Sequence, residues 1–297
     1  MLVIPQAMDE TFEMVDGLPS ESRHCLAGPT LLEQVESAWQ FASGRHEEML
    51  KRIAQTTANE LTAWLRWINN LAAQKGVHLD VVFIDSPAYG ARVKRSHQAK
   101  YRIEIDLGTI PALLYIAPIV DMSFRDEFTF WHDIEQSVKS LKQTGFPNTS
   151  ITSYGESLVV SAVTMVFLHE VAHALGGHLM WPDIGRDKSA DLPRYTISYR
   201  AAETDADWGA GRMFAIGLFE QRTAINDIAR RLVGSATINH IALQIRSGPT
   251  KRYHLPQLRM IVNIHGADSA CHVFGIDQNA FHNAVCQCTA LSNEVWA

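Results

Sequence analysis

The sequence predicts an α+β fold that is rich in helices, on three observations. Apolar residues recur at three- and four-residue steps from Leu61 to Ala72, which is the period of an amphipathic helix. Segment 79–84, LDVVFI, is rich in strand-forming residues, and apolar side chains alternate with polar ones from Tyr101 to Gly108. Residues 156–177 are apolar enough for a buried helix that ends at its two glycines. We therefore expect helices packed on a small mixed sheet.

The first part of the chain predicts an arm followed by helices. Residues 1–30 show no clear period and are interpreted as an N-terminal arm. Apolar positions in 31–42 and again in 49–53 predict one or two helices with a break near residues 43–44, separate from the helix of Leu61 to Ala72. Gly76 stands where a glycine is expected just beyond the end of that later helix.

Two further segments complete the expected organisation. Residues 91–100, ARVKRSHQAK, lie between the two strands, and we interpret this basic run as a solvated hairpin or loop. Apolar spacing in 124–141 predicts another helix. No linker clearly divides the chain, so we expect one domain over 31–297, with a scaffold part (31–150) and a metal-binding part (151–297).

Composition excludes several classes of function. The chain of 297 residues has 26 Lys and Arg against 32 Asp and Glu, and its net charge of −6 argues against nucleic acid as a partner. The apolar stretches 110–120 and 158–168 are shorter than the roughly 18–20 residues of a membrane span. We find no secretory signal pattern, and four cysteines are too few for a disulfide scaffold. A cytoplasmic location and no membrane partner are therefore expected.

A candidate metal motif lies in the long apolar helix, at HEVAH of 169–173. A helix turns by about 100° per residue, so His169 and His173 lie on one face and can bind one ion. Glu170 can reach a water on that ion without being a ligand. Two histidines leave tetrahedral zinc needing one more protein ligand and a water, as in catalytic zinc sites. The pattern is the HExxH motif of zinc peptidases, although two buried, hydrogen-bonded histidines without metal are the alternative.

The third ligand has two candidates from the residues themselves. Glu203 lies in AETDADWGA (202–210), a segment of small residues typical of a helix packed closely against another, and Asp207 shares its face and can accept the second N–H of a ligand histidine. His178 follows the two glycines, one residue earlier than the HExxHxxGxxH spacing requires. We favour Glu203, keep His178 as the alternative ligand, and leave open that neither binds.

HEVAH followed about 30 residues later by ETDADWGA resembles the gluzincin metallopeptidases, in which a downstream glutamate joins HExxH. The resemblance implies His169, His173 and Glu203 as zinc ligands, Glu170 as general base and Asp207 as the acid that orients a ligand. More narrowly, the HEVAHALGGH segment and the chain length are similar to the Lit-type phage-exclusion peptidases, cytoplasmic bacterial enzymes that cleave a host protein. We accordingly expect a zincin-like fold and a protein or peptide substrate; an activating protein or peptide is left open.

Several gluzincins also carry a His-Pro or Tyr-Pro element followed by Arg, which YHLPQLR (253–259) resembles imperfectly. His254 or Tyr253 would then donate a hydrogen bond to the oxyanion. The alternative interpretation of this segment is a helix that begins with Pro256 in its first turn.

Two further expectations concern other parts of the chain. The half-exposed strand from Tyr101 to Gly108 is expected at the edge of the sheet, where an extended peptide could add to it. Cysteines and histidines between 271 and 288 could form a second, structural zinc site, but they include no C-x-x-C pair, and we interpret them as ordinary core and surface residues. The predicted function is peptide hydrolysis by zinc-activated water with Glu170 as base; the alternative is a non-catalytic zinc-stabilised regulatory or binding protein.

Overall fold

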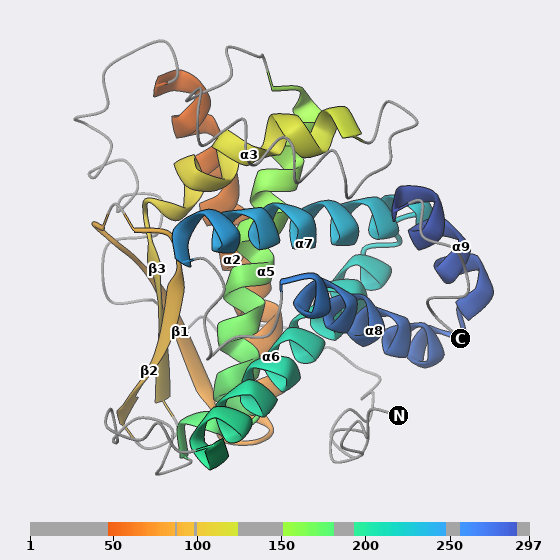
Figure 1. The fold of residues 1–297 in the computed structure, drawn as a ribbon. Coiled ribbons are helices and arrows are strands. Elements are labelled where there is room, and N and C mark those ends of the chain that lie inside the picture. The colour runs from red at the N-terminus through yellow and green to blue at the C-terminus, as the bar shows by residue number, and fades with distance from the viewer. Residues whose placement is uncertain are drawn as a thin grey trace.

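The computed structural model describes residues 47–86, 88–97, 100–123, 151–180, 193–247 and 256–289. Within these residues the chain is helix-rich α+β with a small mixed sheet, which confirms the expected class (Figure 1). The elements in chain order are α2 (Glu47–Ala73), β1 (His78–Ile84), β2 (Ala91–His97), β3 (Lys100–Asp106), α3 (Thr109–Ser123), α5 (Ser153–Leu175), the 3-10 helix η2 (His178–Met180), α6 (Pro193–Glu220), α7 (Ile225–Ser247), α8 (Pro256–Phe274) and α9 (Gln278–Thr289). The predicted arm and the helices expected in 31–42 and 124–141 lie outside the described residues.

Helix α2 is longer and more continuous than the sequence pattern predicts. Residues 49–53 and 61–72 were expected in separate helices, but both belong to α2. Between them the buried face continues through small side chains, Ala54, Thr57 and Ala58, which the search for large apolar residues overlooks. The helix ends as predicted, with Gly76 in the left-handed region at a φ of 66°.

The sheet has the strand order β1-β3-β2, which corrects the expected edge. Strand β1 pairs parallel with β3, and β2 pairs antiparallel with β3, so the strand expected at the edge is the central one. The edge is instead β2, a strand formed by the basic run 91–97. The sequence does not indicate a strand here because the run is rich in charged residues. In the structure the exposed residues Arg92 and Lys94 form ion pairs with Glu104 on the neighbouring strand β3.

Helix α5 is the central element of the core. Figure 1 shows it between the sheet on one side and α6 and α8 on the other, with α3 and α7 crossing one end. It begins after Thr152, whose side chain accepts a hydrogen bond from the backbone N–H of Gly155. Helix α5 is longer than its most apolar stretch, residues 158–168, and by length and composition it could cross a membrane. However, 72% of its most apolar 18-residue window is buried inside the structure, as in a core helix.

Helix α6 lies in close contact with both α5 and α8 because small residues line its faces. A side-chain carbon added at Gly209 would lie 3.0 Å from the Cβ of Ala172 on α5. On the other side, a carbon added at Gly266 of α8 would lie 2.0 Å from the backbone oxygen of Trp208. The two contacts fix α6 between α5 and α8, so that side chains from all three helices meet.

Candidate metal site

The two histidines of HEVAH lie in the last two turns of α5, one helical turn apart. Their Nε2 atoms are 3.1 Å apart, and the ring planes are inclined at 85°. Both nitrogens therefore approach one point from the same face of the helix, as the i and i+4 spacing predicts.

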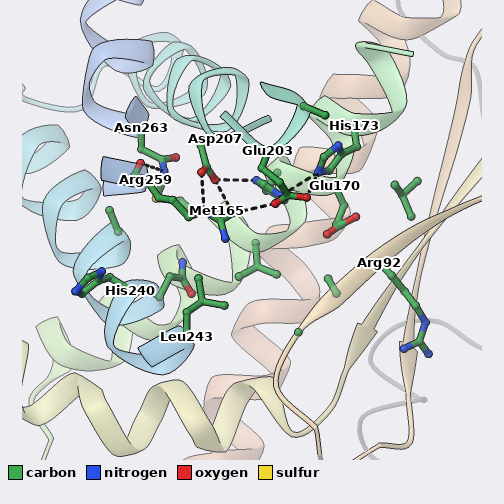
Figure 2. Close-up of a pocket in the computed structure, with 18 of the residues that line it drawn as sticks. Arg92, Met165, Glu170, His173, Glu203, Asp207, His240, Leu243, Arg259 and Asn263 are labelled. Atoms are coloured by element: carbon green, nitrogen blue, oxygen red, sulfur yellow. Dashed lines mark hydrogen bonds and ion pairs between the residues drawn. The ribbon is translucent and has the colours of Figure 1, made fainter. Parts of the chain in front are cut away.

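Glu203 reaches that point from α6. Its Oε2 lies 3.4 Å from Nε2 of His169, and its Oε1 lies 3.4 Å from Nε2 of His173. Neighbouring donors of a tetrahedral zinc ion with bonds of roughly 2.0–2.2 Å are about 3.3–3.6 Å apart. The two Nε2 atoms are close to this distance from each other, and each is close to this distance from its own nearer oxygen of Glu203. His169, His173 and Glu203 thus form a group that could hold a metal ion, with Glu203 itself buried. Figure 2 shows Glu203 and His173 turned toward each other.

Behind this group lies a second layer of charged side chains. Oδ1 of Asp207, one turn along α6 from Glu203, is 2.9 Å from Nδ1 of His169. Arg259 on α8 donates to both carboxylate oxygens of Asp207, at 2.6 and 2.8 Å, and its guanidinium also lies 3.5 Å from Glu203 (Figure 2). Asp207 is therefore where the sequence places it, beside the outer nitrogen of a candidate ligand.

His178 does not belong to the group of three donors. Its Nδ1 lies 2.8 Å from Nδ1 of His173, on the opposite side of that ring from Nε2. Its Nε2 lies 2.9 Å from Oδ2 of Asp205. In this geometry the ring of His178 contacts the outer nitrogen of His173, so the structure does not bring the alternative ligand His178 to the point where the three donors meet.

The electrostatics of the group favour a positive charge at its centre. Burial opposes ionisation of His169, but the carboxylates of Asp207 and Glu203 outweigh burial and raise the pKa of His169 to about 10. Burial also opposes ionisation of Glu203, yet the two imidazoles and Arg259 hold its pKa far below the usual range. In the metal-free protein a proton on His169 occupies the place that a cation would take.

A cavity of about 400 Å³ opens at the three donors. Glu170 lines it, and Figure 2 shows the Glu170 carboxylate in the same space as His173 and Glu203. The start of β2, including Arg92, forms one wall, while α7 and α8 form another. Glu170, the general base predicted from HExxH, therefore lines the same cavity as the three candidate metal ligands.

The remaining sequence predictions have different outcomes. His254 and Tyr253, the candidate donors to an oxyanion, lie outside the described residues. Helix α8 begins at Pro256, in agreement with the helix-start interpretation of this segment. The sequence did not predict the role of Arg259, which it indicated only as the arginine of YHLPQLR. Arg259 contacts Asp207 and Glu203 because α8 packs on α6.

Comparison of the chain with protein-family models, with curated proteins and with solved structures found no match.

Proposed function

We propose that this chain is a zinc-dependent peptidase of the gluzincin type with a zincin-like fold. The supporting observation is the convergence of one ligand atom from each of His169, His173 and Glu203 within 4.8 Å of one another, with Glu170 lining the cavity that these donors face. Two imidazoles and one carboxylate suit zinc better than magnesium or calcium, which favour oxygen ligands. Three protein ligands leave one position for substrate or water, as in catalytic zinc sites.

The charge of the site supports a divalent cation. Glu170, Glu203 and Asp207 supply three carboxylates near the cavity, and Arg259 supplies one guanidinium that contacts two of them. Buried charges are costly unless they are balanced, and a divalent ion would bring these groups to neutrality.

Glu170 is proposed as the general base and then the general acid of peptide hydrolysis. Zinc, when bound, supplies polarisation of the scissile carbonyl and makes a water molecule more acidic. Glu170 accepts a proton from the attacking water, whose oxygen forms the new bond to the carbonyl carbon. Glu170 then returns that proton to the nitrogen as the C–N bond breaks, so the products are a carboxylic acid and an amine.

We further propose that an extended peptide binds along β2. Within the described residues, β2 pairs with a neighbouring strand only on its β3 side, and Ala91, Arg92 and Val93 line the cavity. A strand added there would run past Glu170 and the metal group. The narrower resemblance to phage-exclusion peptidases suggests a host protein in the cytoplasm as the substrate, and an activating protein or peptide remains part of this hypothesis.

The test compares wild type with Glu170→Gln, using Glu48→Gln on an exposed position of α2 as the matched control. Each zinc-loaded protein is incubated with a cell extract, and new protein N-termini are mapped. We expect wild type and Glu48→Gln to generate the same cleavage sites, and Glu170→Gln to bind zinc but generate none. Equal cleavage by Glu170→Gln would overturn the mechanism. Zinc binding by wild type without any cleavage would favour the alternative, a zinc-stabilised regulatory or binding protein.

A further inference from the structure

We infer that His178 and Asp205 are positioning residues that fix the ring of His173 and select the nitrogen it presents to the metal. The inference rests on the proposed metal site and assigns these two residues a role other than ligation. It begins from a chain of contacts: Nδ1 of His173 to Nδ1 of His178 at 2.8 Å, then Nε2 of His178 to Oδ2 of Asp205 at 2.9 Å.

The end of α5 is built to place His178 there. Gly176 ends the helix, and a side-chain carbon at this residue would lie 2.9 Å from Nε2 of His178, so the imidazole occupies the space that glycine leaves open. Gly177 has a φ of 70°, a backbone conformation that turns the chain back toward the helix. As a result His178, in η2, is buried against His173.

With two neutral imidazoles and a carboxylate in the chain of contacts, one assignment of protons makes both contacts hydrogen bonds. A carboxylate can only accept, so in this assignment Nε2 of His178 donates to Asp205. A neutral imidazole has one donor and one acceptor nitrogen, so Nδ1 of His178 accepts from Nδ1–H of His173. Nε2 of His173 then keeps a free lone pair, and this nitrogen faces Glu203 and His169.

Different outer partners thus orient the two candidate ligand histidines. His169 is held by Asp207, a buried carboxylate that Arg259 also contacts. His173 is held through a second imidazole, and its chain ends at Asp205, whose side chain is 31% exposed. Both outer partners direct an Nε2 atom to the centre, where two imidazole nitrogens 3.1 Å apart can share one cation.

The experiment measures the zinc Kd of the full chain by competition with a chelator, together with the visible absorption spectrum of the Co²⁺-substituted protein. Outer partners of metal-binding histidines typically contribute 10- to 100-fold to metal affinity. We expect His178→Ala to weaken zinc binding by about 10- to 100-fold and to alter the Co²⁺ absorption bands, and Asp205→Ala to weaken it by about 10-fold.

Two further variants separate positioning from a general structural effect. His178→Gln offers an amide oxygen that can accept from His173, so it should recover part of the lost affinity and of the wild-type Co²⁺ spectrum. Asp227→Ala removes an exposed carboxylate in the first turn of α7 and should leave both measurements unchanged.

The outcomes distinguish this inference from the metal site itself. Wild-type affinity in both His178→Ala and Asp205→Ala would overturn the positioning role while leaving the metal site intact. The positioning role would also be overturned if His178→Gln bound zinc as weakly as His178→Ala and no variant changed the Co²⁺ absorption spectrum. Absence of zinc binding by wild type would overturn the metal site, and the positioning role with it.

Discussion

Two regions of this molecule present potential metal ligands at the same helical spacing, yet only one of the two brings three donors close enough to hold a metal ion. On α5, His169 and His173 lie four residues apart, and on α9 so do His282 and Cys286. In the first region α6 brings Glu203 within 3.4 Å of both histidines. In the second region Nε2 of His282 instead lies 2.9 Å from Asp268 on α8.

The Cys271 thiol of the second region is in an unfavourable state for metal binding. Cys271 is buried in α8, and burial raises its pKa to about 12. Within the part of the chain that the structure describes, the group of three donors close enough to hold an ion is His169, His173 and Glu203. Helical spacing therefore supplies a pair of donors, and only the approach of a second helix completes a site.

The largest expected effect is on metal content. Glu203→Ala removes one of three donors, so it should weaken zinc binding by more than the roughly 100-fold upper range of outer-partner substitutions. The measurement is the zinc-to-protein ratio after dialysis, supported by a chelator competition. His282→Ala is the control from α9 and should keep the wild-type ratio. The comparison would fail if Glu203→Ala kept its zinc, or if His282→Ala lost an equal share.

The second expected effect is on folding stability. Arg259 and Asp207 form a pair with two hydrogen bonds in which the side chains are 14% and 6% exposed, whereas those of His282 and Asp268 are 28% and 18% exposed. Arg259→Met leaves a buried carboxylate without its guanidinium and should lower the free energy of unfolding by about 3–5 kcal/mol. His282→Ala should lower it by about 1 kcal/mol or less. Urea unfolding of the metal-free proteins provides the measurement, and equal losses would contradict the contrast between the regions.

The third expected effect is on the pH dependence of zinc binding. The pKa of His169 is raised to about 10 in the metal-free protein, so the proton stabilises the fold fully below about pH 6.5, and this contribution is lost as pH rises through about 10. Zinc must displace this proton. We therefore expect its affinity to rise roughly tenfold per pH unit between pH 6 and 8.

The pH measurement also distinguishes the two regions. Chelator competition at pH 6, 7 and 8 should report the release of about one proton per zinc ion. A site that used two thiols of the second region would release two protons per zinc ion and would show a steeper dependence. An affinity independent of pH would contradict a proton on His169.

Helices and helix ends that depend on residues close together in the sequence could be predicted. Elements that depend on contacts between distant parts of the chain were predicted less well. The α5 helix and the Gly76 helix end follow from apolar period and glycine position, and both are observed. The continuity of α2 was missed because small residues carry its buried face. The basic run was expected as a solvated hairpin or loop, and a hairpin of β2 and β3 is observed, but β2 was not recognised as the edge strand of the sheet because Glu104 on β3 neutralises its charges. The position of Glu203 was predictable because its small neighbours indicate close helix packing.

By itself, the sequence determines that His169 and His173 share one face of a helix with Glu170 beside them, because backbone geometry alone sets which residues share a helical face. The tertiary structure decides which residues complete the group. Glu203, Asp207 and Arg259 lie 30 to 90 residues from His169, and His178 is a partner of His173 rather than a donor only because of how the chain turns at Gly177. Such contacts depend on the packing of α5, α6 and α8 against one another, which is a property of the whole core.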